Sequence, residues 1–310
     1  MPGPKVVVFG YHDIGYACLE ALLDAGVNVV AVFTHDDQPD KEVIWFRSVR
    51  DLAVSHHIPV YSPAHPNDSQ TLSLLKTLAP DLIFSFNYRR LVGNDILQLA
   101  SLGAFNMHSS YLPAYRGRVP VHWAILNNEN KIGATLHHMV LELDGGDIVD
   151  QEAVAIGETE TSKNVLEKVT RAARVIIERQ LSNLLTGRAP RFPQDEKLAS
   201  YFGGRTHEDG LIDWQQSARQ VFNLIRATTH PYPGAFSYVK ERRFYVWWAK
   251  PVIQQHAHQP GEIISDNPLR IATHDGYVEV LQYQWQDSPM SKDPRLHGLS
   301  CGQLLGVAGE

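Results

Sequence analysis

Cysteines and long apolar runs are both scarce in this 310-residue chain. The two cysteines, Cys18 and Cys301, can form at most one disulfide and match no metal-ligand spacing, so we interpret both as packing residues. The longest apolar runs, at 5–9 and 27–33, are far shorter than the roughly 20 residues that cross a bilayer. The residues before the first run do not form a secretory signal. These absences predict a cytoplasmic protein without a membrane span.

Basic charge is also in deficit, because 28 lysines and arginines face 34 acidic residues and leave a formal net charge of -6. A broad basic field usually drives binding to polyphosphate backbones, so we expect no nucleic-acid partner. The apolar and charged shares, 44% and 20%, are typical of an ordinary globular protein and not of a disordered one. A chain of this length favours two domains.

The first half of the chain alternates strand and helix patterns. A β-rich run at 5–9, a helical pattern over 14–23 and a strand at 27–33 predict a βαβ unit. Apolar strands follow at 82–86 and 104–107. Strands that are apolar on both faces indicate a sheet covered by helices on both sides.

The second half changes character. Strands are predicted at 133–140 and 148–156, and a long helix has apolar residues at helical spacing over 165–176. Residues 187–212 are rich in glycine, proline and charge, which is typical of a linker. A helix at about 214–228 and a series of short strands then predict a small β-barrel. These strands lie near 235–239, 243–249, 260–265, 269–273 and 277–283.

Two segments that could suggest cofactors carry no usable motif. The segment Gly10–Gly15 follows the first strand, where α/β folds place ligands, but it lacks a dinucleotide fingerprint and the lysine of a phosphate loop. A plain strand-to-helix turn explains it equally well. The histidine pairs His137–His138 and His256–His258 lack a metal-ligand context, so we expect no catalytic metal.

Three polar residues suit acyl transfer. Asn106 and His108 end a predicted strand two residues apart, so both side chains point to the same side. An amide there can stabilise an oxyanion while an imidazole handles a proton. Asp144 lies on a glycine turn, where its carboxylate can orient the imidazole and raise its pKa. Taken singly, these residues are more often capping groups and a hairpin turn.

In combination, these residues resemble the 10-formyltetrahydrofolate-dependent formyltransferases. The family pattern is Asn-x-His-x-Ser, then Leu-Pro-x-x-Arg-Gly, then Asp-x-Gly, and it is present in order at 106–110, 112–117 and 144–146. Further similarity runs through 205–235. The resemblance implies a Rossmann-like catalytic domain, assigned to 1–204, and a small OB-like barrel, assigned to 205–310.

The resemblance also implies roles for individual residues. Asn106, His108 and Asp144 become the catalytic trio. The co-substrate 10-formyltetrahydrofolate is expected in a pocket lined by Arg90, Leu91, Val92, Val140, Leu141, Glu142, Leu143 and Asp144. Arg118 and Arg205 are predicted contacts to the acceptor, because guanidinium groups bind carboxylate and phosphate oxygens well, although surface ion pairing explains each almost as well.

The acceptor is inferred from a closer similarity inside the family. Segments such as 11–15, 33–35 and 115–118 resemble the formyltransferase domain of the polymyxin-resistance proteins, which formylates UDP-4-amino-4-deoxy-L-arabinose for lipid A modification. Those proteins carry a second, dehydrogenase domain, which we expect another polypeptide to supply. The alternatives are methionyl-tRNA formylation, another UDP- or dTDP-linked amino sugar, hydrolysis of the folate, and a binding module without catalysis.

Overall fold

The computed structural model describes residues 3–36, 45–291 and 298–306, and the chain divides into two compact units. The first unit consists of Met1–Val121, Lys131–Ala155 and Val165–Gly203, and the second of His122–Asn130, Ile156–Asn164 and Gly204–Glu310. Two short segments ahead of residue 204 thus belong to the second unit, so a single boundary in the sequence does not separate the two units. The boundary at 204/205 stays a prediction.

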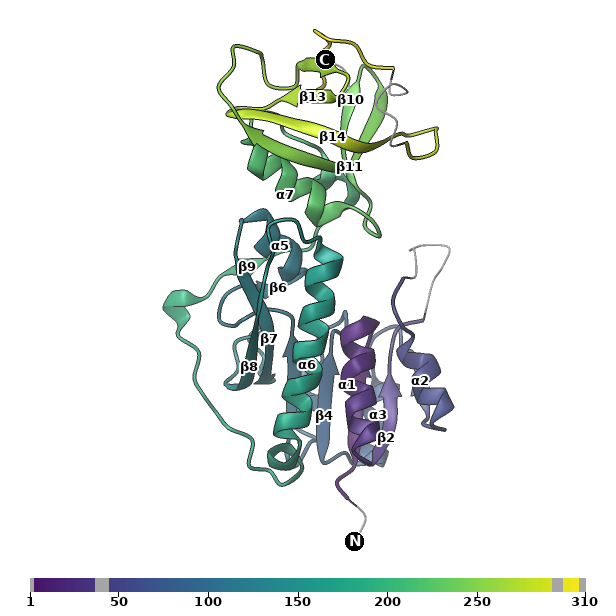
Figure 1. The fold of residues 1–310 in the computed structure, drawn as a ribbon. Coiled ribbons are helices and arrows are strands. Elements are labelled where there is room, and N and C mark those ends of the chain that lie inside the picture. Colours follow the sequence, from purple (N-terminus) through teal and green to yellow (C-terminus); the bar gives the residue numbers. More distant parts are fainter. Residues whose placement is uncertain (1–2, 37–44, 292–297, 307–310) are drawn as a thin grey trace. The chain divides into compact units, whose positions relative to one another are not determined.

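The first unit is built on a seven-stranded sheet in the order β3-β2-β1-β4-β5-β7-β8 (Figure 1). Neighbouring strands from β3 to β5 are parallel, and β7 and β8 add antiparallel strands at one edge. The predicted Rossmann-like architecture is therefore confirmed. The strands are β1 (Val6–Gly10), β2 (Val29–Phe33), β3 (Val60–Tyr61), β4 (Leu82–Phe86), β5 (Gly103–His108), β7 (Lys131–His138) and β8 (Ile148–Ala155).

Helices cover both faces of this sheet. The helices α1 and α6 lie on one face, in front of β4 in Figure 1, and Arg174 of α6 forms ion pairs with Glu20 and Asp24 of α1. The other face packs Phe9 and Ile83 in one cluster with apolar residues of α3 and α4. All residues of β1 and β4 are accordingly buried. The helices of this unit are α1 (His12–Asp24), α2 (Val49–Ser55), α3 (Ser69–Leu78), α4 (Asn94–Leu97) and most of α6 (Ser162–Leu185), whereas most of α5 (Pro120–Leu126) belongs to the second unit.

The second unit packs α7 (Ala218–Thr228) against an antiparallel sheet in the order β10-β11-β14-β13-β12. The helix begins at residue 218, four residues later than predicted, because Ser217 and Gln220 form a capping box there. Leu304 and Gly306 make bridges to Glu262 and Tyr238, so the end of the described chain links the two edges of the sheet. This linkage gives the predicted small barrel. The strands are β10 (Ala235–Val239), β11 (Arg242–Ile253), β12 (Ile263–Asp266), β13 (Leu269–Ala272) and β14 (Gly276–Trp285).

The segment predicted as a linker is partly built into the first unit. Phe192 bridges Ile148 of β8, and β9 (Tyr201–Phe202) pairs with β6 (Arg116–Gly117). Between them lies a short 3-10 turn, Glu196–Leu198. The segment has no apolar periodicity because it is held by hydrogen bonds and short pairings. We call residues 190–202 the strap.

Candidate active site

Asn106 and His108 come from β5, which runs parallel to β4 and antiparallel to β7. Both side chains are carried at the carboxyl end of the strand, the edge at which open α/β sheets bind ligands. His108 is 7% exposed, and Asn106 is half-buried. Strand pairing sets Asn106 opposite His137 and His108 opposite Thr135 of β7.

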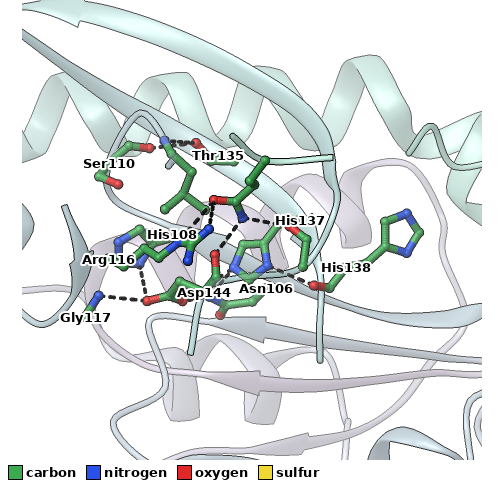
Figure 2. A network of polar contacts seen from close by, with 12 residues as sticks. Asn106, His108, Ser110, Arg116, Gly117, Thr135, His137, His138 and Asp144 are labelled. Atoms are coloured by element: carbon green, nitrogen blue, oxygen red, sulfur yellow. Dashed lines mark hydrogen bonds and ion pairs between the residues drawn. The ribbon is translucent and has the colours of Figure 1, made fainter. Parts of the chain in front are cut away.

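Asp144 reaches the same place from the turn between β7 and β8. Its backbone has φ +53°, a left-handed conformation, and the main-chain N–H of Gly117 donates to Oδ2 at 2.9 Å. Gly146 is required in this turn, because a Cβ there would lie 1.9 Å from the carbonyl oxygen of His138. The Asn106 amide Nδ2 donates to Oδ1 of Asp144 at 3.3 Å. The structure thus brings the three predicted residues together (Figure 2).

The orientation of His108 differs from the expectation. Its Nε2 lies 2.8 Å from the carbonyl oxygen of Tyr115, and because a carbonyl only accepts, Nε2 carries a proton. Nδ1 faces Oδ2 of Asp144 at 3.6 Å, which is too long for a hydrogen bond. The carbonyl of Tyr115 therefore orients the imidazole, and Asp144 acts on it through charge.

His137 also belongs to the site, although its sequence context predicted no role for it. Its Nδ1 donates to the carbonyl oxygen of His138 at 2.9 Å, which leaves Nε2 to accept from Nδ2 of Asn106 at 3.1 Å in the neutral ring (Figure 2). Asn106 therefore has one amide group that faces both His137 and Asp144. The only sequence signal was the neighbouring strand at 133–140, since its register against 104–107 decides which residue meets Asn106.

Asp144 is held as a carboxylate. Burial alone would raise its pKa, but the charge of His108, the contact with His137 and the N–H of Gly117 outweigh burial and hold the pKa well below its ordinary value. A fixed negative charge therefore lies beside two imidazole rings.

The residues predicted to bind the folate lie in two segments of the first unit. Arg90, Leu91 and Val92 follow β4, and residues 140–143 precede Asp144. Leu91 and Leu141 are 71% and 77% exposed, whereas Val92 is buried beside Ile96. Large exposed apolar side chains next to polar catalytic groups are typical of a binding surface.

The two predicted acceptor contacts belong to different units. Arg118 is exposed in the first unit, where its N–H donates to Phe202 at 2.9 Å. Arg205 of the second unit donates to the carbonyl oxygen of Asp209 at 2.6 Å and lies over the ring of Trp123 at 5.1 Å. Its guanidinium is thus already engaged inside its own unit, and burial lowers its pKa.

Within residues 3–36, 45–291 and 298–306, no cluster of three or more His, Cys, Asp or Glu side chains could hold a metal ion. No helix of this described part is both long enough and apolar enough to cross a membrane.

A crystal structure of an N-formyltransferase from Helicobacter canadensis, in complex with folinic acid and dTDP-3-aminofucose, is 21% identical over 89% of this chain and 97% of that chain, with a TM-score of 0.66. WlaRD, a sugar 3N-formyl transferase crystallised with dTDP and 5-N-formyl-THF, is 18% identical over 92% and 99%, with a TM-score of 0.63. A 4-N formyltransferase from Francisella tularensis is 20% identical over 77% and 93%, with a TM-score of 0.61.

These likenesses establish the fold, and family models add the relationship by sequence. The model described as formyl transferase matches residues 4–181, which is more than half of the chain, and the model of the formyl transferase C-terminal domain matches residues 205–294. With the fold, the polar site at the end of β5 and both matches in agreement, the chain belongs to the formyl transferase family.

Proposed function

We propose that this protein moves the formyl group of 10-formyltetrahydrofolate to the amino group of a nucleotide-linked amino sugar. The observation that carries the proposal is the convergence of Asn106, His108 and Asp144 at the end of β5 in a chain of the formyl transferase family. The similar structures support the reactants, since the same two of them contain both a reduced folate and either dTDP or a dTDP-linked amino sugar. UDP-4-amino-4-deoxy-L-arabinose, used in lipid A modification and polymyxin resistance, is the acceptor we propose to test first.

In the proposed mechanism the neutral amine attacks the formyl carbon. A new C–N bond forms, a tetrahedral oxyanion develops, and the bond from that carbon to N10 of the folate then breaks. The ammonium proton must leave as the intermediate forms. Nδ1 of His108 is the nitrogen available to accept it, because Nε2 already donates to Tyr115. His108 or a bound water then returns a proton to N10.

Asn106 is proposed to stabilise the oxyanion. Its Nδ2 already faces two acceptors, and the longer contact, 3.3 Å to Asp144, is the one a developing oxyanion can replace. Such a donor is worth about 3 kcal/mol in comparable sites. Replacement of Asn106 should therefore lower kcat more than it weakens folate binding.

The co-substrate is proposed to lie against the exposed apolar side chains that flank the trio. Leu91, Val140, Leu141 and Leu143 can cover a flat pterin ring, and their exposure fits that role. Loss of Leu141 should raise the KM for the folate with a smaller change in kcat, because it would contact the ring and not the reacting atoms.

The test is an assay of tetrahydrofolate production from 10-formyltetrahydrofolate. Acceptors are UDP-4-amino-4-deoxy-L-arabinose, dTDP-linked 3-amino and 4-amino sugars, methionyl-tRNA, and none. His108→Ala should abolish acceptor-dependent turnover, whereas His56→Ala, a change of an exposed histidine, should leave it unchanged. Turnover with only another amino sugar would show that the acceptor is that sugar and not UDP-4-amino-4-deoxy-L-arabinose. Turnover with only methionyl-tRNA would show that the acceptor is not a nucleotide sugar. Acceptor-independent formate release indicates hydrolysis, and an active His108→Ala variant removes the proposed mechanism.

A further inference from the structure

A fully buried arginine connects the strap to the segment that follows His108. Arg116 is 0% exposed, and its guanidinium donates to both carboxylate oxygens of Glu196, at 2.7 and 3.0 Å. It also donates to Oε1 of Gln194, at 2.8 and 3.2 Å, and to the hydroxyl of Tyr201. A buried cation is costly unless its donors are matched, so these bonds hold the strap against β6.

Gln194 continues the connection from Arg116 to the catalytic turn. Because Oε1 accepts both bonds from the guanidinium, the amide can have only one orientation, and Nε2 must point away from Arg116. Nε2 donates to the carbonyl oxygens of Asp144 and Gly146, each at 2.7 Å. Every hydrogen-bonding atom of this side chain is therefore used, and two of the bonds end on the turn that carries Asp144.

The turn depends on contacts of this kind. Asp144 has a left-handed backbone, and the preceding residues 141–143 are exposed, so little apolar packing holds them. Asp144 is instead fixed from two sides by adjacent residues of β6. The N–H of Gly117 binds its carboxylate, and the side chain of Arg116, through Gln194, binds its backbone.

The geometry points to a positioning role for the strap, and we propose that Gln194 is a positioning residue for the formyl transfer. Its amide holds the backbone of Asp144 so that the carboxylate stays beside His108 and His137. This inference rests on the catalytic role proposed above for Asp144. The strap lies between the two family matches, at 4–181 and 205–294, so neither of them covers Gln194. Small displacements of a catalytic group can cost roughly 100-fold in rate.

Gln194→Glu separates the two halves of this connection. The new carboxylate still accepts from Arg116 but cannot donate to Asp144 and Gly146, and it puts negative charge against their carbonyl oxygens. We expect kcat to fall by about 10- to 100-fold while the KM for 10-formyltetrahydrofolate changes by less than about twofold.

Two further variants make the test decisive. Gln215→Glu makes the same chemical change at an exposed position of the second unit and should match the wild type. Gln194→Met keeps the length of the side chain without the charge of glutamate and serves if Gln194→Glu does not fold. It should show the same loss of kcat with the same small change in KM. Wild-type kcat in the folded Gln194 variants, or a rise in KM that accounts for the whole loss of kcat/KM, would overturn the positioning role. If the positioning role is overturned while His108→Ala is inactive in the same assay, the proposed function still stands. If His108→Ala is active, the proposed function itself fails.

Discussion

At the scale of single residues, hydrogen bonds from three neighbours define the surroundings of Asp144. Asn106 donates to His137 and Asp144, His137 donates to a backbone carbonyl, and Gly117 donates to Asp144. Buried polar groups in such a network stabilise one arrangement because any other leaves a group unsatisfied. The site is therefore organised before the substrates bind, as electrostatic catalysis requires.

His137 should matter for turnover because it helps to orient the amide of Asn106. His137→Phe removes the acceptor for Asn106, so the amide loses one of the two bonds that orient it. We expect kcat to fall by roughly 10-fold with little change in the KM for the folate, as steady-state kinetics will measure. His56→Phe, at an exposed position, is the matched control. Equal kinetics for wild type and His137→Phe would show that His137 only fills space.

The lowered pKa of Asp144 predicts how stability depends on pH. A carboxylate whose pKa is depressed in the folded state contributes stability above its unfolded pKa of about 3.9, and that contribution is lost as the pH falls through the folded value. At pH 7, the free energy of unfolding of Asp144→Asn, measured by urea denaturation, should therefore be lower than that of wild type by about 1.5–3 kcal/mol. The difference should begin to narrow as the pH falls below about 4 and should go on narrowing toward pH 2. A difference that does not depend on pH would contradict this assignment of charge.

At the scale of elements, two irregular segments connect parts of the sheets that are distant in the sequence. The strap joins β6, β8 and the turn of Asp144, and residues 302–306 link the edges of the five-stranded sheet. An open sheet edge leaves backbone groups unpaired, and pairing with a terminal segment removes that cost. Neither segment has the apolar periodicity of a helix or a strand, since hydrogen bonds and short pairings to other segments fix its conformation.

The closing segment of the second unit can be tested with two adjacent leucines. Leu305 is 4% exposed and belongs to the core of the second unit, whereas Leu304 is 53% exposed. Leu305→Ala should lower the free energy of unfolding by about 2–4 kcal/mol, since it deletes buried methylene groups. Leu304→Ala should change it by less than about 0.5 kcal/mol. Thermal unfolding of both variants decides, and equal losses would argue against the closed barrel.

At the scale of the whole molecule, charge separates the possible acceptors. The net charge of -6 opposes association with a long polyanion, whereas a nucleotide sugar carries only a few phosphates and can be bound by a few arginines. The same consideration applies to solution behaviour, because a protein far from neutral charge resists self-association.

This charge predicts the outcome of a binding experiment with tRNA. We expect no mobility shift of methionyl-tRNA at micromolar protein, even at about 50 mM salt, where phosphate-driven binding is strong. Formylation of the amino sugar should meanwhile vary little with added salt. A shift that disappears between about 50 and 200 mM salt would indicate a local basic surface and would favour the tRNA alternative.

The sequence by itself determined the elements whose signal is local. The strands 82–86 and 235–239 were predicted to the residue, because continuous apolar residues between turn residues mark a buried strand wherever it lies in the fold. Asn106, His108 and Asp144 were predicted as a trio from their spacing and from the motif, and the structure places them together. Some errors were local too: the capping box at Ser217 marked the start of α7 and was overlooked, and β11 extends to Ile253, beyond its predicted end.

Only the tertiary structure decided which residues support the trio. Asn106 and His137 are 31 residues apart, and Gln194 lies 50 residues from Asp144, so their hydrogen bonds leave no periodic pattern in the chain. Register made the first contact, because a shift of one residue in the pairing of β5 with β7 would turn the imidazole of His137 to the other face of the sheet. The contact of Gln194 with Asp144 follows from the buried charge of Arg116, because its donors need acceptors and the strap supplies them through Gln194 and Glu196.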